Sequence, residues 1–366
     1  MSSSSTGATV PLFKGGGDFH RDLKALVRER LTPSVRRRGR IRFYAKAVTM
    51  FAWWAASWTF LVFFAANWWQ AAIGCVSLAF AMGGIGFGVQ HDTNHGALGK
   101  RAKWLGLSLD LMGMSSYLWR ERHNHAHHTF TNVVDKDGDI DQLPFARFAP
   151  DQKLHRFHRF QHIYMFALYG FYAPKAVMFG DFHAIWKGPN WHVPVKRPRG
   201  KDLAVFILGK AAMLSWLLFI PMIFHPWWQV LIVAFAALWV LGIILAIVFQ
   251  LAHCVEEADF TSEERMIQEA IENGPREWAR HQVETTVDFG RRSRILNWYL
   301  GGLNFQTEHH LLPHVPHVHY RALSPEFEAL CVQHGVRYNA HASLTSALRS
   351  HARWLKRMGQ PLPGDF

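Results

Sequence analysis

Two long blocks of the sequence are almost free of charged residues, and they predict a membrane protein. The blocks run from Ala47 to Val89 and from Leu203 to Ala252. A membrane-spanning helix needs about 20 apolar residues, so each block predicts a helical hairpin. Breaks at residues 67–70 and 225–229 contain Trp pairs, which are typical of a membrane interface. We therefore expect four spans, at about 44–66, 69–90, 203–224 and 229–252. Two buried hairpins of a soluble protein would not need blocks this long.

The charge distribution predicts how these spans are oriented. The net charge is +13, and basic residues crowd residues 36–46, before the first span, and 100–103, after the second. The two Trp-containing turns lack Lys and Arg. The positive-inside rule then places both termini and the middle segment in the cytoplasm. Attraction of anionic lipid or of a phosphate-bearing substrate remains a further use for the basic residues. Nucleic acid is not an expected partner, because no basic stripe is interleaved with exposed aromatic residues.

Cysteine usage and the N-terminus narrow the class further. Cys75, Cys254 and Cys331 are the only cysteines, and no CxxC motif is present. This argues against a disulfide framework or a thiolate zinc site. Residues 1–9 lack the layout of a signal peptide, so we expect the first span to serve as the targeting signal.

These patterns predict an all-α integral membrane protein with two transmembrane hairpins and a cytosolic helical cap. Residues 1–43 are expected to hold a disordered stretch (1–17) and an amphipathic helix at about 19–31. The transmembrane hairpins occupy 44–90 and 203–252, and the cytosolic segments occupy 91–202 and 253–366. Within these segments we expect an interfacial or re-entrant helix at 104–118 and an amphipathic helix over 324–358.

Three polar clusters stand out in this otherwise apolar chain. Residues three and four apart share a face of a helix, and this spacing relates the clustered side chains: His91 with His95, His123 with His127, and Gln306 with His309 and His310. His128 directly follows His127. The last span ends at His253, as the second ends at His91. Even-numbered spans leave the membrane on the same side, so the topology alone predicts that all eight histidines meet at one face.

Eight histidines are too many for one metal ion, since a zinc site takes four ligands. Two metal ions with five or six ligands each would use the whole set. Neutral nitrogen ligands favour a redox-active transition metal over Mg or Ca. At a membrane surface this predicts oxygen activation against an alkyl chain, with no catalytic side chain beyond the metal ligands. Four neighbouring polar residues could orient the imidazoles: Asp92, Asn94, Asn304 and Glu308.

The same residues resemble the membrane fatty acid desaturases, specifically the bacterial acyl-CoA or acyl-lipid type related to front-end and linoleoyl-CoA desaturases. The motifs are His91-Asp-Thr-Asn-His95, His123-Asn-His-Ala-His127-His128 and Gln306-Thr-Glu-His309-His310, and the resemblance covers about residues 40–325. It implies a di-iron centre whose two Fe ions use O2 to form a cis double bond in an acyl chain. Carried over by position, the implied ligands are His91, His95, His123, His127, His128, His253, His309 and His310.

The resemblance also implies partners and a location. The chain has no His-Pro-Gly-Gly motif of a fused cytochrome b5 domain. We therefore expect a separate electron donor, such as ferredoxin, rubredoxin or cytochrome b5 with its reductase. The expected location is a bacterial inner membrane, among membrane lipids, with the metal site on the cytoplasmic side.

Several alternatives stay open at this stage. Gln306 stands where many desaturases have histidine, and the sequence does not determine whether it binds iron. His125 could replace His123 as a ligand, and a fourth set of histidines occupies positions 155, 158 and 162. Hydroxylation or ketolation of an alkyl or carotenoid chain would use the same centre, and a histidine-rich metal transporter is a different class. Chain length, double-bond position, acyl carrier and oligomeric state are not determined by the sequence.

Overall fold

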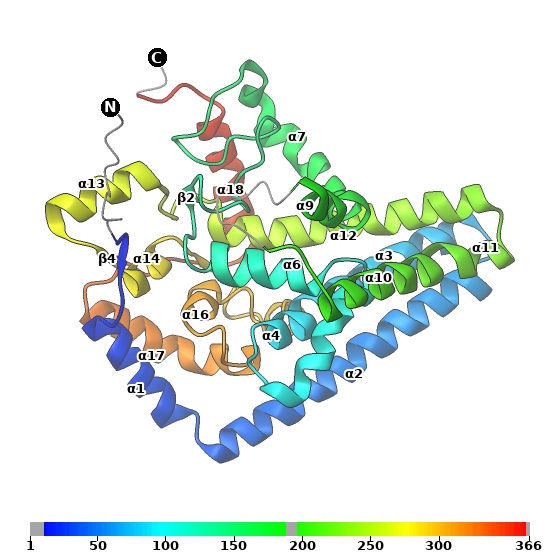
Figure 1. The fold of residues 1–366 in the computed structure, drawn as a ribbon, viewed down its shortest axis with the longest axis horizontal. Coiled ribbons are helices and arrows are strands. Elements are labelled where there is room, and N and C mark those ends of the chain that lie inside the picture. The colour runs from blue at the N-terminus through cyan, green and yellow to red at the C-terminus, as the bar shows by residue number, and fades with distance from the viewer. Residues whose placement is uncertain (1–10, 188–195, 364–366) are drawn as a thin grey trace.

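The computed structural model describes residues 11–187 and 196–363 as a mostly helical protein (Figure 1). The α-helices are α1 (Asp18–Arg30), α2 (Pro33–Phe63), α3 (Trp68–Ile85), α4 (His91–Asn94), α5 (Ser108–Leu111), α6 (Ser116–Arg120), α7 (Gln161–Leu168), α8 (Tyr172–Lys175), α9 (Asp181–Lys187), α10 (Lys201–Leu214), α11 (Ile220–Phe224), α12 (Trp227–His253), α13 (Glu263–Asn273), α14 (Trp278–Glu284), α15 (Arg294–Tyr299), α16 (Gln306–Leu311), α17 (Tyr320–Gln333) and α18 (Leu344–Met358).

Shorter elements join these helices. Four segments are π-helical: η1 (Gly86–Gln90), η3 (Glu121–His127), η6 (Ala176–Gly180) and η7 (Ser215–Phe219). Four more are 3₁₀-helical: η2 (Lys100–Leu107), η4 (Arg156–Phe160), η5 (Tyr169–Phe171) and η8 (His317–His319). Two-residue strands pair in parallel within the described residues: β1 (Phe13–Lys14) with β4 (Arg276–Glu277), β2 (Val133–Val134) with β3 (Thr261–Ser262), and β5 (Asp288–Phe289) with β6 (Ala340–His341).

The long helices run together to one side of the molecule, and the shorter helices gather at the other (Figure 1). α2 packs along α3, and α3 packs along α12. The turns of the two hairpins lie at the same end, because Nε2 of His225 is 2.7 Å from the carbonyl oxygen of Val62. Asn67 begins α3 by accepting a hydrogen bond from the backbone N–H of Gln70 at 3.2 Å. Both predicted turns are therefore confirmed, and the opposite ends of α3 and α12 point toward the shorter helices.

Three helices in the described part of the chain are long and apolar enough to cross a membrane: Trp68–Asn94, Lys201–Phe224 and Trp227–His253. α2 is not among them, since its first half carries Arg and Lys and its second half contains several Trp, Ser and Thr residues. Large apolar side chains on these helices face outward, including Trp68 (82% exposed) and Ile223 (75% exposed). Such exposure is expected of a surface that contacts lipid.

Three predicted segments differ from the structure. The prediction of a single helix at 104–118 is wrong: Gly113 has a φ of +96°, and the helical conformation is interrupted there between α5 and α6. The single helix at 324–358 is also wrong, because Gly335, with a φ of +60°, ends α17 and Ser343 caps α18. Residues 13–14 form β1 and are not disordered. Residues 1–10 of the predicted disordered stretch lie outside the described residues.

The amphipathic helix near the N-terminus is confirmed as a helix that docks on the protein. α1 buries Phe19, Leu23 and Val27 in a cluster that includes Phe327 of α17. Arg30 extends this contact with an ion pair to Glu326 at 2.6 Å. α2 begins soon after, at Pro33, so the basic residues 36–46 belong to the same helix as the first predicted span.

The loop between α15 and α16 generates a prediction about stability. Gly301 has a φ of +60°, and a Cβ atom there would overlap the carbonyl oxygen of Phe87 in η1. Gly335 has the same φ but open space around it. Gly335→Ala should cost about 1 kcal/mol, from the left-handed backbone alone. Gly301→Ala should cost about 2 kcal/mol more, because the backbone must also move.

Apparent midpoints of thermal unfolding in detergent check this prediction. The midpoint should be highest for the wild type, lower for Gly335→Ala and lowest for Gly301→Ala. Equal midpoints for the two variants would contradict the close packing of this loop on η1.

Candidate metal centre

The eight histidines expected from the sequence come together where α3 and α12 meet the shorter helices. They lie on η1–α4 and its end (His91, His95), on η3 and its end (His123, His127, His128), at the end of α12 (His253) and on α16 (His309, His310). None of the eight side chains is more than 9% exposed. The inferred convergence on one face is therefore what the fold produces.

The imidazoles form two adjoining groups. Within each group, the candidate ligand atoms all lie within 4.8 Å of one another. One group is His91, His95, His123 and His309, and the other is His127, His253 and His310. His128 lies between them: its ring centroid is 4.7 Å from that of His309 and 4.3 Å from that of His310. The geometry therefore offers two neighbouring positions for metal ions.

A π-helical turn sets the register of the second motif. The sequence spacing assumes an α-helix, on which His123 and His127 share a face. In η3 the bonding changes, and the N–H of His128 donates to the carbonyl oxygen of His123 at 3.1 Å. Hydrogen bonds from i to i+5 are the signature of π-helix, which is frequent at functional sites. His128 is thereby brought to His123, with 3.3 Å between their Nε2 atoms.

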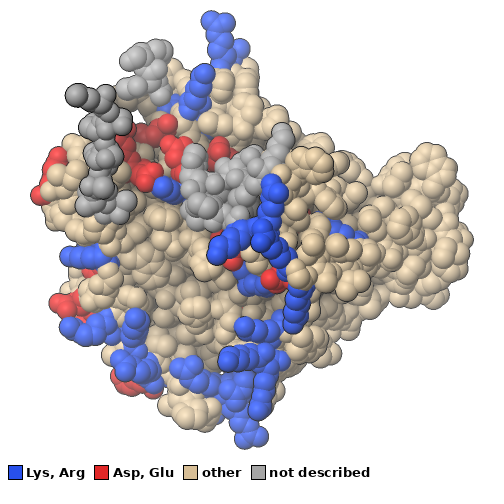
Figure 2. Space-filling view, viewed as in Figure 1, with Lys and Arg blue, Asp and Glu red and all other residues tan. Residues whose placement is uncertain are grey.

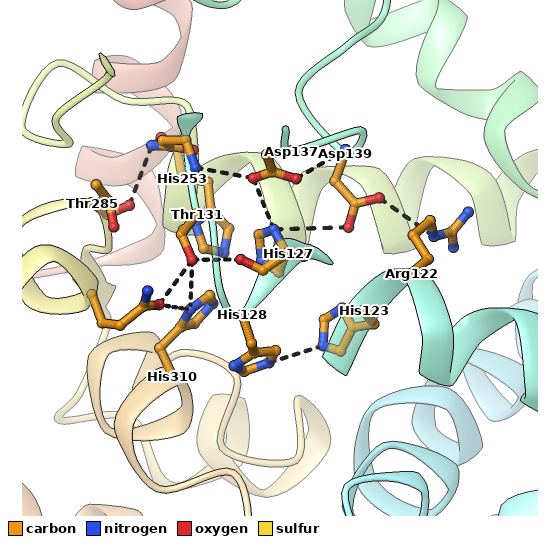
Figure 3. Close-up of polar contacts among 12 residues, drawn as sticks. Arg122, His123, His127, His128, Thr131, Asp137, Asp139, His253, Thr285 and His310 are labelled. Carbon is orange, nitrogen blue, oxygen red and sulfur yellow. Dashed lines mark hydrogen bonds and ion pairs between the residues drawn. The ribbon is translucent and has the colours of Figure 1, made fainter. Parts of the chain in front are cut away.

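Hydrogen bonds from outside the cluster orient two of the rings (Figure 3). Nδ1 of His127 is 2.9 Å from Oδ2 of Asp137. Nδ1 of His310 is 2.8 Å from Oε1 of Gln282 and 3.1 Å from the hydroxyl of Thr131. Both contacts leave Nε2 of the ring pointing toward the other histidines. Partners of this kind fix the orientation of an imidazole and the nitrogen it presents to a metal.

These orienting residues carried unequal signals in the sequence. Asp137 belongs to an acidic run just after the second motif. Gln282 lies on α14, far from any histidine motif, and no sequence pattern marks it.

A single asparagine holds the end of α12 against the cluster. Asn132 has a φ of +56°, a left-handed conformation that Asn tolerates better than most residues. Its Nδ2 donates to the carbonyl oxygens of His253 at 2.9 Å and of Thr285 at 3.2 Å. Its backbone N–H donates to Oδ2 of Asp137 at 3.0 Å, so Asp137 supports both His127 and this clamp.

The remaining ligand candidates occupy different positions. The carboxamide nitrogen of Gln306 is 2.9 Å from Nε2 of His253, so Gln306 adjoins the second group. His125 lies outside both groups: its side chain is 67% exposed, and its Nε2 lies 4.0 Å from a carboxylate oxygen of Glu121. His158 is also elsewhere, with its Nε2 2.7 Å from the carbonyl oxygen of Pro144.

The four neighbouring polar residues make their hydrogen bonds away from the eight rings. Asp92 accepts from Nδ1 of His317 at 2.8 Å, and Asn94 donates to the side chain of Gln90 and the backbone of Gly106. Asn304 donates to the carbonyl oxygen of Phe289 at 3.1 Å. Glu308 approaches Tyr338 at 3.5 Å. The hydrogen bonds of these four side chains therefore do not orient the eight rings directly.

Burial keeps most of the rings neutral. It lowers the pKa well below the ordinary value, and neighbouring imidazoles add to the effect, for His95, His123, His128, His309 and His310. His127 is the exception. Burial opposes its protonation, but the carboxylate of Asp137 reverses the effect and raises the pKa. Neutral imidazole is the form that binds metal ions.

The hydrogen bonds also leave nitrogens without partners. Among the described residues, no hydrogen bond reaches the buried Nε2 atoms of His95, His127, His309 and His310, or the Nδ1 atoms of His128 and His253. A buried polar atom without a partner costs about 1–3 kcal/mol. Bound metal ions would satisfy these atoms together, so the residues fit a metal centre.

Comparison with known proteins decides the family. The model of the fatty acid desaturase family matches residues 66–342, which include all three histidine motifs. The chain belongs to the fatty acid desaturase family. It is therefore an oxidoreductase of lipid metabolism, and the metal-transporter alternative is set aside. The family uses metal, and the two histidine groups are where this desaturase could hold it.

Similar proteins extend over most of the chain. The sn-1 linoleoyl-lipid 6-desaturase of Arthrospira platensis is 35% identical, over 86% of this chain and 85% of its own length. A protein of the same name from Synechocystis is 32% identical, over 87% of this chain and 88% of its own length. The acyl-lipid (8-3)-desaturase of Physcomitrium patens is 36% identical, over 82% of this chain and 64% of its own length.

The support of His127 by Asp137 generates a prediction about metal retention. Asp137→Asn removes the charge that orients His127 and should lower metal affinity by about 10–100-fold. Metal content per protein, measured by mass spectrometry after dialysis against a chelator, checks it. Asp141→Asn, at an exposed position of the same acidic run, is the control. Equal metal content in both variants would contradict the assigned role of Asp137.

Proposed function

We propose that this desaturase introduces a cis double bond into the acyl chain of a membrane lipid, using O2 at a centre of two iron ions. The observation that carries the proposal is the convergence of eight buried imidazoles at the ends of apolar helices long enough to span a membrane. An alkyl chain offers no acidic proton, so its C–H bonds call for redox chemistry at a metal. O2 takes up the two hydrogens that the substrate loses, together with two electrons and two protons from the electron donor and solvent, and becomes two waters.

The proposed metal ligands follow the two groups of histidines. His91, His95, His123 and His309 would hold one iron ion, and His127, His253 and His310 the other, with His128 between them. Iron supplies the capacity to activate O2. The chain supplies neutral imidazoles and a buried space that excludes water, and Asp137 and Gln282 keep Nε2 of two rings directed inward. We assign Gln306 to positioning His253, because its carboxamide lies against Nε2 of that ring.

The proposed membrane arrangement includes α2 as a fourth span. α2 packs along α3, and its second half carries outward-facing apolar side chains such as Val48 and Phe63. Basic residues lie where α2 enters the membrane, and the turns between spans lack them, which supports a cytoplasmic metal site and cytoplasmic termini. The short helices would then form a cytosolic cap, at the inner membrane of a bacterium.

The names of similar proteins support an acyl-lipid as substrate and a double bond nearer the carboxyl end than the methyl end of the chain. Two relatives are named linoleoyl-lipid 6-desaturases, and a third is named for an acyl-lipid. The two electrons would come from a separate protein, such as ferredoxin, rubredoxin or cytochrome b5 with its reductase.

Product analysis tests the reaction. Expression in a host of known lipid composition should yield fatty acids two hydrogens lighter than the host's own, as measured by gas chromatography with mass spectrometry. The new fatty acids should disappear when O2 is withheld. Fatty acids that gain oxygen would instead indicate hydroxylation or ketolation at the same centre.

A pair of histidine variants tests the proposed ligands. His309→Ala should reduce the unsaturated product at least a hundredfold, because it removes a ligand candidate from the larger group. His125→Ala is the matched control, since this exposed histidine lies outside both groups, and it should retain product. Protein amount in membranes, measured by immunoblot, separates loss of activity from loss of protein. Full activity of His309→Ala would contradict its role as a ligand.

A further inference from the structure

A pocket of about 370 Å³ opens beside the middle of α2, and none of the eight clustered histidines lines it. It is lined by Arg42, Lys46, Thr49, Asn297, Trp298 and His317, among others. No acidic side chain lines it in the part of the chain that the structure describes. Figure 2 shows Lys and Arg gathered over the beginning of α2, the helix that lines one side of the pocket. Its side chains are therefore basic and hydrogen-bonding in character.

Lys46 is the unusual residue of this pocket, because a lysine is rarely buried. Its side chain is only 3% exposed, and Nζ lies 5.7 Å from the ring centroid of Trp298. Within the described residues, Nζ of Lys46 forms one side-chain hydrogen bond, to Nε2 of His317 at 3.3 Å. An ammonium group has three donors, so two remain for a further partner.

A buried relay fixes the direction of this hydrogen bond. Nδ1 of His317 is 2.8 Å from Oδ2 of Asp92, and the backbone N–H of His317 donates to the same oxygen at 3.0 Å. A carboxylate accepts, so Nδ1 of His317 carries the proton and its Nε2 accepts from Lys46. The negative charge of Asp92 thus stabilises the ammonium group of Lys46 through His317. The two remaining N–H donors of Lys46 stay available to a ligand.

Further polar groups line the pocket beside Lys46. Arg42 lies four residues before Lys46 on α2, and the two side chains therefore share a face. The carboxamide oxygen of Asn297 is buried and has no hydrogen-bond partner among the described residues, so it can accept from a hydroxyl group. Exposed apolar side chains stand close in sequence to the lining residues: Val48 (69%) precedes Thr49, and Ile295 (82%) lies two residues before Asn297. Basic groups beside apolar ones are suited to the level of lipid head groups.

We propose that this pocket binds a phosphate group of the acyl substrate, with Arg42 and Lys46 as donors. The proposal rests on the proposed function and specifies its substrate as a phosphate-bearing acyl compound. The phosphate belongs either to a glycerophospholipid or to coenzyme A. Lys46 is linked through His317 to Asp92, which is next to His91 in the chain, so the pocket adjoins the proposed metal centre. A head group held there keeps the carboxyl end of the acyl chain close to that centre.

Steady-state kinetics of the purified full-length desaturase, with its electron donor, test this site. The same acyl chain is presented on phosphatidylglycerol, on coenzyme A and on an uncharged galactolipid. Loss of one charged hydrogen bond should raise KM for the phosphate-bearing substrate about tenfold relative to KM for the galactolipid. This ratio should rise in Arg42→Gln and in Lys46→Met. Arg40→Gln, on the other face of α2 and outside the pocket lining, is the matched control and should leave the ratio unchanged.

The outcomes separate the possible sources of phosphate. A raised ratio for phosphatidylglycerol supports a phospholipid head group, and a raised ratio for the coenzyme A thioester alone supports that carrier. An unchanged ratio for both phosphate-bearing substrates in Arg42→Gln overturns the site. Arg42 is exposed, so this variant decides the question if Lys46→Met fails to fold.

Binding without turnover keeps the pocket distinct from the proposed reaction. Native mass spectrometry of the desaturase with phosphatidylglycerol should show bound lipid that is lost in Arg42→Gln and kept in Arg40→Gln. That result, with no desaturation by the wild type on any substrate, would support the pocket and reject the proposed function. Equal retention of the lipid by both variants would reject the pocket.

Discussion

Eight imidazole rings share a buried space, and the rest of the structure must offset the free-energy cost of burying their polar nitrogens. Buried nitrogens without hydrogen bonds are costly, and six such atoms of these rings have no partner among the described residues. Burial keeps most of the rings uncharged, which avoids repulsion between them but does not satisfy the free nitrogens. Bound metal ions would do so. The cluster therefore has the character of a site whose stability is completed by its ligand, as is general for metal sites that form on folding.

The scaffold meets this constraint by combining rigid helices with local departures from α-helical bonding. α3 and α12 are long enough to deliver His91 and His253 from two separate hairpins to one place. The π-helical segments η1 and η3 then adjust the final turns. η1 immediately precedes His91, and η3 brings His128 to His123. Changing the register over a few residues lets side chains from one segment serve both histidine groups.

Chemistry and membrane position are coupled in the proposed enzyme through a short chain of residues. The histidine groups lie at the ends of apolar helices long enough to span a membrane, and Lys46 of the basic pocket is linked through His317 to Asp92, the neighbour of His91 in the chain. An acyl substrate in the membrane has its polar end at the surface and its alkyl chain in the interior. A site that holds the polar end next to the metal centre selects which carbons come near the metal. Position of the double bond would then follow from where the head group binds.

The sequence by itself determined the features that depend on composition and on local spacing. Apolar blocks with Trp-containing breaks predicted both hairpin turns, and the parity of the spans predicted that His91 and His253 would meet. These predictions worked because hydrophobic length and topology act over whole helices and tolerate local irregularity.

Only the tertiary structure decided the features that depend on contacts between distant segments. Gln282 and Asn132 hold the cluster through partners that spacing does not reveal: Gln282, for example, is 28 residues from His310 in the sequence. The π-helical register of η3 and the glycine breaks in the predicted helices at 104–118 and 324–358 likewise depended on backbone conformation. The hydrophobic pattern does not encode such conformations, because one glycine or one i to i+5 bond changes the direction of the chain without changing which residues are apolar.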